Sequence, residues 1–182
     1  MIIESKSIRH KHMEWVLRCP REEDGAELSR LRITIDGETE FLDREPGEDY
    51  LSPESFRALI RDDAESDKAL FLVAEVDGKI VGFTRCVGSP LKRYRHKADF
   101  GICLTQDYCG HGIGKILLEH VLLWSDYVGI EKISLSVVES NVNAIKLYRK
   151  YGFIEEGKLL KDRIHSDGKY YNTVLMGRTL RD

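Results

Sequence analysis

The sequence predicts an α/β (α+β) fold, in which strands and helices follow one another along a chain of 182 residues. Short apolar runs rich in β-branched residues are interspersed with segments whose apolar residues recur at helical spacing. Asp77-Gly78 separates two strand-like runs and is typical of a tight hairpin turn. A three-glycine segment, residues 110–114, stands where a predicted strand passes into a predicted helix. The length suits one domain, with residues 1–13 as an N-terminal extension of undefined structure.

The first third of the chain predicts one strand and two helices. Residues 14–18 form the strand, and Pro20 with the acids that follow it favours the start of a helix, because proline and acids suit a helix N-terminus. A second helix begins after Ser52 and runs toward Asp63. Between the two helices, residues 36–51 are acidic and contain glycine and proline, so they predict a long loop.

The remaining sequence predicts six strands and two helices. The predicted strands are residues 70–76, 79–87, 97–104, 133–139, 153–161 and 169–176. Apolar residues at helical spacing predict a helix over residues 113–128, which Gly129 ends. Asn141 is placed to cap the last helix, and Gly152 to close it. No segment repeats another.

Charge and hydropathy exclude several classes of protein. The formal net charge of -3 argues against broad binding of nucleic acids or membrane surfaces, because both attract basic proteins. The apolar runs are too short or too polar to span a bilayer, and residues 1–12 lack the features of a signal peptide. We therefore expect a cytoplasmic protein. The cysteines have no C-x-x-C pair and no histidine at metal-ligand spacing, so we expect free thiols and no metal site.

The glycine segment predicts an anion site. Gly110, Gly112 and Gly114 lack a β-carbon where a helix begins, so backbone N–H groups can point at a phosphate along the helix dipole. Glycines at such a turn also serve close packing alone, and that alternative stays open. A Walker P-loop does not match, since three residues separate Gly110 from Gly114 and Ile116 replaces the hydroxyl residue. The dinucleotide fingerprint also fails, because its third glycine would lie one residue later.

Two segments resemble the GNAT superfamily of N-acetyltransferases. Residues 109–114, Cys-Gly-His-Gly-Ile-Gly, are similar to the family's Arg/Gln-x-x-Gly-x-Gly/Ala motif, and residues 141–153 to its N-x-x-A-x-x-L-Y-x-K-x-G-F segment. Cys109 departs from the motif's Arg or Gln, which removes a side chain from the pyrophosphate site. His111 and Lys115 offer positive charge there instead. An inert turn residue is a better interpretation of Cys109 than a nucleophile, because no strong base adjoins it in sequence.

The resemblance implies a fold and a cosubstrate. The fold is a mixed, mostly antiparallel central sheet of six to seven strands, with about four helices on its two faces and with strands splayed at the cofactor site. The cosubstrate is acetyl-CoA. Its pantetheine arm would pair, as an added strand, with residues 102–104 at the end of the strand predicted over residues 97–104. The implied cofactor-binding residues are Ile102, Cys103, Leu104, Cys109, Gly110, His111, Gly112, Ile113, Gly114, Lys115, Asn141, Ala144 and Tyr148.

The resemblance also implies an acyl-CoA-dependent enzyme that acetylates a primary amine by direct attack, through a tetrahedral intermediate. The oxyanion donor would be a backbone N–H near Leu104, and Tyr148 would protonate the departing thiolate. Tyr148 also lies on an apolar helical stripe, where core packing is its alternative role. Glu139 leads Asp99 as the general base, and His165 and His96 remain further candidates.

The acceptor is not specified by these motifs. Glu38, Glu40 and Glu45 lie in the acidic loop that this family uses to wall the acceptor cleft, so they predict attraction of a cationic amine such as a polyamine, an aminoglycoside or a protein N-terminus. A solvated acidic loop is the alternative. The resemblance makes a homodimer plausible. A non-catalytic CoA-binding regulatory or interaction module of the same fold is the alternative function, and a structural role for the glycines is a third.

Overall fold

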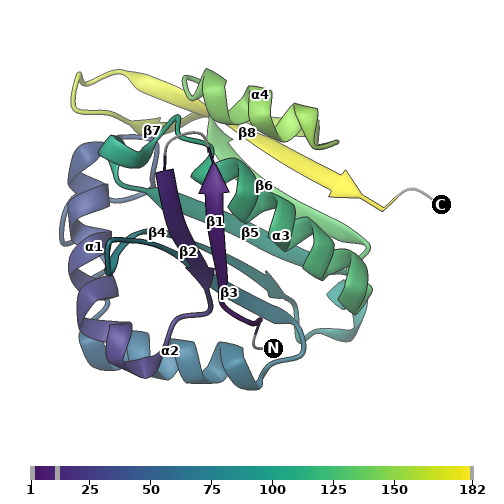
Figure 1. Ribbon diagram of the computed structural model, residues 1–182. Helices are drawn as coiled ribbons and strands as arrows, with labels where there is room; N and C mark the ends of the chain where they lie inside the picture. The colour runs from purple at the N-terminus through teal and green to yellow at the C-terminus, as the bar shows by residue number, and fades with distance from the viewer. Residues whose placement is uncertain (1–2, 11–12, 181–182) are drawn as a thin grey trace.

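A computed structural model describes residues 3–10 and 13–180, and one eight-stranded sheet forms its centre (Figure 1). The strands are β1 (Lys6–His10), β2 (Met13–Arg18), β3 (Ala69–Val76), β4 (Lys79–Gly88), β5 (Lys97–Leu104), β6 (Lys132–Val138), β7 (Ile154–Ile164) and β8 (Tyr170–Thr179). The helices are α1 (Gly25–Glu38), α2 (Pro53–Glu65), α3 (Ile113–Val128) and α4 (Val142–Lys150), with short 3-10 turns η1 (Glu22–Asp24), η2 (Lys92–Tyr94) and η3 (Gln106–Tyr108).

The sheet has the order β1-β2-β3-β4-β5-β6-β8-β7. Every neighbouring pair is antiparallel except β5 and β6, which are parallel. The predicted mixed, mostly antiparallel sheet is therefore confirmed. The predicted number of strands was too low by one, because Lys6–His10 pairs with β2 in the segment that sequence analysis left as an extension. Residues 1–2 and 11–12 of that extension lie outside the described part.

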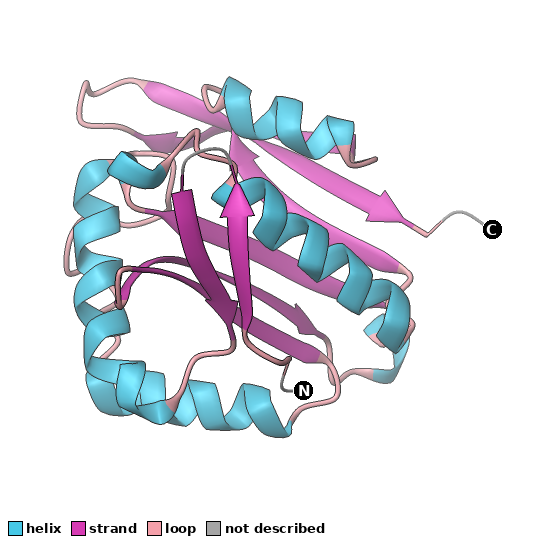
Figure 2. Ribbon diagram, in the orientation of Figure 1, coloured by secondary structure: helices cyan, strands magenta, loops and turns pink. Residues whose placement is uncertain are grey.

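Helices cover both faces of the sheet (Figure 2). On one face α3 and α4 pack through residues such as Leu117 and Ile145 on a core that includes Leu70 and Leu72 of β3. On the other face α1 and α2 pack against alternate residues of the same strand, including Phe71. A strand buried on both faces explains why β3 is an almost unbroken apolar run. Within residues 3–10 and 13–180, no helix combines the length and the apolar character that crossing a membrane requires.

Local chemistry explains most element boundaries. Asp77 and Gly78 adopt positive φ angles of 49° and 75°, which match the right-handed twist of the β3–β4 hairpin. Gly129 ends α3 with a φ of 75°, and the Asn141 side chain accepts a hydrogen bond from Ala144 N at 3.2 Å to cap α4. The first helix differs from its prediction: α1 begins at Gly25 after η1 rather than near Pro20, and it continues to Glu38. The acidic loop is therefore shorter than predicted.

A buried ion-pair cluster joins β2, η1 and β3. The guanidinium of Arg18 donates from Nη1 to Asp24 Oδ2 at 2.6 Å and from Nε to Glu75 Oε2 at 2.7 Å. The side chains of Arg18 and Asp24 are only 10% and 13% exposed. Burial raises the pKa of the Asp24 carboxyl, but hydrogen bonds from Arg18 and from Arg21 N outweigh burial and hold that pKa below its usual value.

We predict that Asp24→Asn lowers the free energy of unfolding by about 2–4 kcal/mol at pH 7, because Arg18 then stays buried beside a neutral partner. A lowered folded-state pKa contributes stability above the unfolded pKa of about 3.9, and this contribution is lost as the pH falls through the folded value. The difference between wild type and variant, measured by urea unfolding, should therefore shrink below pH ~4. Glu14→Gln, at an exposed pair with Arg9, is the control and should change little. A difference that stays constant with pH would contradict the charge-based explanation.

Candidate active site

The sheet opens between β5 and β6. These parallel strands pair over three positions only, from Lys97 opposite Lys132 to Asp99 opposite Ser134, and then both continue without pairing to each other. We call the region between their unpaired ends the fork. Because the strands are parallel, their carboxyl ends lie at the same edge, and each leads into a helix that starts there, α3 after β5 and α4 after β6. The fork is therefore bordered by two helix N-termini, whose dipoles favour a negatively charged group.

The open edge of β5 presents backbone groups toward the fork. Thr105 N donates to Val81 O at 2.9 Å, so this amide points toward β4. Successive residues of a strand point their N–H groups to opposite sides, so the amides of Ile102 and Leu104 point away from β4 and toward the fork. The amide of Cys103, between them, points toward β4. Its side chain is partly buried against the core beneath α1 and α2. Two of the three strand residues predicted to bind the cofactor thus direct amides into the opening.

The glycine loop enters α3 at the fork. Gly110 and Gly112 have φ angles of 79° and 90°, which only glycine adopts without strain. Ile116 N donates to Gly112 O at 3.1 Å as the first turn of the helix closes. The amides of Ile113, Gly114 and Lys115 precede that bond, so the helix itself supplies them with no acceptor. Such a set of N–H groups suits a phosphate.

The side chains of the loop contribute little to nucleophilic chemistry. Cys109 is exposed, and its Sγ lies 3.5 Å from Thr105 O. Partial burial and the charge of Glu38 raise the pKa of its thiol, so it stays protonated at neutral pH. His111 is exposed, and Lys115 Nζ lies 3.7 Å from Glu119. His111 is thus an exposed residue and Lys115 a half-buried one, and both border the start of α3.

His10 is a neighbour of the loop that sequence analysis did not identify. A β-carbon built on Gly112 would lie 2.7 Å from both Cδ2 and Nε2 of its imidazole. His10 ends β1, and Figure 1 shows the β1–β2 hairpin reaching the start of α3. The predicted extension therefore packs a histidine on the residue that precedes the helix. No sequence motif indicates this contact, since it depends on the pairing of β1 with β2.

Tyr148 lies at the beginning of the fork. It is 8% exposed, and its ring meets Phe100 edge-on with a centroid distance of 6.0 Å. Phe100 is the first residue of β5 beyond the segment that pairs with β6. Burial raises the pKa of the Tyr148 phenol to about 12, so the hydroxyl is protonated over the whole neutral range. Ala144 lies about one turn earlier on the same helix, and Asn141 about two turns earlier, at its N-cap.

The four candidate bases lie in different places, and His165 is on the β7–β8 connection, where its ring stacks on Tyr171. His96 and Asp99 are exposed residues at the amino-terminal, paired end of β5, away from the unpaired end at Leu104. Glu139 follows β6 directly, and its carboxylate accepts hydrogen bonds from Asn172 N and from Lys158 Nζ, each at 3.3 Å. The contact with Asn172, opposed by desolvation and assisted by Lys158, lowers the pKa of Glu139. Glu139 also lines a cleft of about 470 Å³ between α4 and β7.

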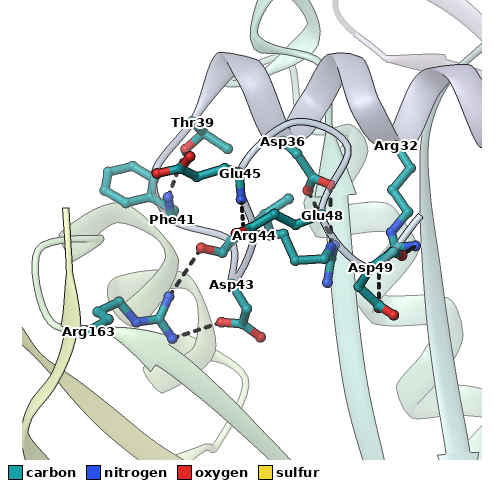
Figure 3. Close-up of polar contacts among 11 residues, drawn as sticks. Arg32, Asp36, Thr39, Phe41, Asp43, Arg44, Glu45, Glu48, Asp49 and Arg163 are labelled. Atoms are coloured by element: carbon teal, nitrogen blue, oxygen red, sulfur yellow. Dashed lines mark hydrogen bonds and ion pairs between the residues drawn. The ribbon is translucent and has the colours of Figure 1, made fainter. Parts of the chain in front are cut away.

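The acidic loop is held by the protein's own donors and cations (Figure 3). Glu38 accepts from Gln106 N at 2.7 Å, and Glu40 accepts from Ser166 N at 2.7 Å. Glu45 lies in a turn in which its N–H donates to Glu48 Oε2 at 2.8 Å. Three arginines pair with acids of the α1–α2 region, namely Arg32 with Asp49, Arg44 with Asp36 and Arg163 with Asp43. These pairs neutralise Asp36, Asp43 and Asp49, and they do not include Glu38, Glu40 or Glu45, the residues predicted to attract a cationic acceptor.

Comparison with known proteins decides the family. Residues 35–153 match the pattern that defines the acetyltransferase (GNAT) family, and they include the glycine loop, the fork and Tyr148. The chain belongs to the GNAT family. L-amino acid N-acetyltransferase AaaT of Escherichia coli is 34% identical over 108 residues, which cover 59% of this chain and 66% of that relative. Spermidine N(1)-acetyltransferase of Vibrio cholerae is 27% identical over 124 residues, 68% of each chain.

Solved structures share the fold. A GNAT-family acetyltransferase from Streptococcus pneumoniae superposes with a TM-score of 0.88 at 30% identity, covering 92% of this chain and 100% of that one. YncA from Salmonella typhimurium, solved with acetyl-CoA, has a TM-score of 0.80 at 15% identity over 92% of this chain and 95% of its own. Acetyl-CoA is the cosubstrate that fits this GNAT chain, because an open strand edge and a glycine-lined helix start lie together at the fork.

We predict that Gly112→Ala weakens acetyl-CoA binding more than a general loss of stability explains. Alanine at the φ of 90° costs about 1 kcal/mol, and its methyl group also collides with His10. Gly129→Ala is the matched control, because Gly129 has a φ of 75° but no atom within 4 Å of an added β-carbon. Calorimetric titration should show a higher Kd for Gly112→Ala and an unchanged Kd for Gly129→Ala. Equal affinities for the two variants would show that the close approach at Gly112 is irrelevant to binding.

Proposed function

We propose that this GNAT protein is an N-acetyltransferase that moves the acetyl group of acetyl-CoA to a primary amine by direct attack. The observation that carries the proposal is the convergence of three features at the fork. They are the unpaired amides of β5, the glycine-lined start of α3 and the phenol-bearing side chain of Tyr148 on α4. Its relatives of known name are N-acetyltransferases, which supports the same reaction type here.

In this proposal, different parts of the chain have different roles in acetyl transfer. The first-turn amides of α3 bind the pyrophosphate, and the edge of β5 aligns the pantetheine arm as an added strand would. The amide of Leu104, directed into the fork, is placed to donate to the developing oxyanion. Tyr148 donates its proton to the departing thiolate, and its pKa of about 12 ensures that the donor is present at neutral pH.

The amine must lose a proton before or during its attack on the thioester. Glu139 follows the last residue of β6, and its carboxylate accepts from Asn172 N of β8 and Lys158 Nζ of β7, on the side of β6 away from β5. Its lowered pKa makes it a weak base at neutral pH. We therefore propose that it orients a water molecule or the ammonium group, and that proton loss from the amine precedes attack.

The test is release of free thiol from acetyl-CoA in the presence of a panel of amines. Tyr148→Phe should lower kcat by about 100-fold, because it removes the proton donor, while the Kd for acetyl-CoA stays unchanged. Tyr151→Phe is the matched control, since Tyr151 lies on the same helical segment but donates to Glu119 Oε1 on α3 at 2.5 Å. Tyr151→Phe should retain wild-type kcat.

Three outcomes separate the functional classes. Thiol release that depends on an amine and on Tyr148 supports the enzyme. Binding of acetyl-CoA, seen as a thermal shift, without thiol release from any amine would support a regulatory or interaction module. No shift with acetyl-CoA at all would leave only a packing role for the glycines. Full activity of Tyr148→Phe would contradict the proton-donor role.

A further inference from the structure

Three buried polar atoms on the β7–β8 hairpin have no hydrogen-bond partner. They are Arg163 Nε, His165 Nε2 and Thr173 Oγ1, and the described residues contain one other such side-chain atom, Trp124 Nε1. The side chain of His165 is 7% exposed, that of Arg163 is 18% exposed, and Thr173 as a whole is 2% exposed. Each unpaired buried polar group costs about 1–3 kcal/mol, so three on one hairpin require an explanation.

The three groups share one face of the hairpin. Arg163 pairs with Tyr171 across the two strands, and the ring of His165 stacks on Tyr171 with a centroid distance of 4.0 Å. Thr173 lies two residues after Tyr171, on the same side of β8. Val174, the next residue, packs into the core beneath α3 and α4. The unpartnered groups therefore face the opposite side of the sheet, where α1 lies.

The acidic loop covers this face. Arg163 donates from Nη1 to Leu42 O at 3.3 Å and from Nη2 to Asp43 Oδ1 at 2.8 Å, so both contacts use its terminal nitrogens and leave Nε unused (Figure 3). Glu40 Oε2 lies 3.6 Å from His165 Nδ1. The loop carboxylates themselves are solvent-accessible, with Asp43 74% and Glu40 49% exposed. The carboxylates of these pairs are thus open to solvent, while Arg163 and His165 lie largely buried beneath them.

The same face adjoins the fork. Thr173 is the register partner of Val138, the last residue of β6. Beyond Val138 the chain passes Glu139, whose N–H donates to Asn172 O at 3.0 Å, and then begins α4. An acceptor amine placed at the open end of β6 would therefore have Thr173 next to it, and Arg163 and His165 further along the hairpin.

We infer that Arg163, His165 and Thr173 form the binding site for the carboxylate of an amino-acid acceptor, beneath the loop of residues 39–48. A guanidinium is a donor only, a hydroxyl can donate, and an imidazole donates from Nε2 in the tautomer that carries its proton there, so an acceptor group is a ligand that all three can share. A carboxylate has lone pairs for all three and forms strong charge-assisted bonds with arginine. A polyamine has no acceptor of this kind and is repelled by Arg163. The inference rests on the proposed function and specifies its substrate class.

The relatives are consistent with either substrate class. The name of AaaT states that it acts on L-amino acids, at 34% identity, and the spermidine acetyltransferases are 27–31% identical to this chain. The three unpartnered atoms distinguish the classes for this chain, because a cationic chain would leave their donors unpaired.

The experiment compares L-amino acids with their α-amides and with spermidine as acceptors for the whole protein. The wild type should prefer an amino acid to its amide in kcat/KM, since the amide lacks the negative charge. Arg163→Met and Thr173→Val should each lower kcat/KM for the amino acid by about 5- to 100-fold and leave that for the amide nearly unchanged. Arg61 of α2, which forms an exposed pair with Glu22 of η1, provides the matched arginine control, and Arg61→Met should change neither value.

Thermal melting and the Kd for acetyl-CoA show whether each variant is folded. Equal use of acid and amide by the wild type, a preference for spermidine, or a parallel loss for both acceptors in Arg163→Met would overturn the inference while leaving acetyl transfer intact. If no amine is acetylated, calorimetry on the CoA-loaded protein replaces kinetics. Tighter binding of an amino acid than of its amide, lost in Arg163→Met, then supports the carboxylate site, and equal binding overturns it.

Discussion

The site depends on one constraint, the end of pairing between β5 and β6 after three residues. A strand whose backbone groups lose their neighbour must find other partners or stay in contact with solvent. Here the loss occurs at the carboxyl ends of two parallel strands, so the same opening receives free amides from β5 and the N-termini of α3 and α4. Positive partial charge, strand-edge donors and an apolar wall around Tyr148 and Phe100 are consequences of that single break in the ladder.

The two faces of the open sheet serve different purposes. The face under α3 and α4 holds the larger apolar core and positions Tyr148 by ring contacts with Phe100 and Phe153. The opposite face, under α1 and the acidic loop, carries the polar groups of the β7–β8 hairpin. The central strand β3, which lies between the two cores, is buried on both sides.

Much of this arrangement is readable from the sequence because its signals are local. The Asp77-Gly78 turn, the Asn141 cap and the glycines before α3 act within a few residues, and all predict their elements. Apolar spacing places Tyr148 on the buried stripe of α4. The family motifs then order these elements in a known sheet.

The remaining features depend on contacts between distant segments. β1 is a strand because it pairs with β2, although its own residues alternate too weakly to predict one. His10 meets Gly112, and Glu40 meets Ser166 across 126 positions of sequence. The ion pair between Arg163 of β7 and Asp43 of the loop spans 120 residues of sequence, so it could not be predicted from the composition of the loop alone.

Hydrogen–deuterium exchange of the whole protein, with and without acetyl-CoA, tests the central claim most directly. Binding at the fork should slow exchange of the amides of Ile102 and Leu104 and of residues 111–115, while Cys103, already directed toward β4, should change little. Protection confined to other regions, or unchanged exchange at these amides under saturating acetyl-CoA, would contradict the assignment of the fork as the cosubstrate site.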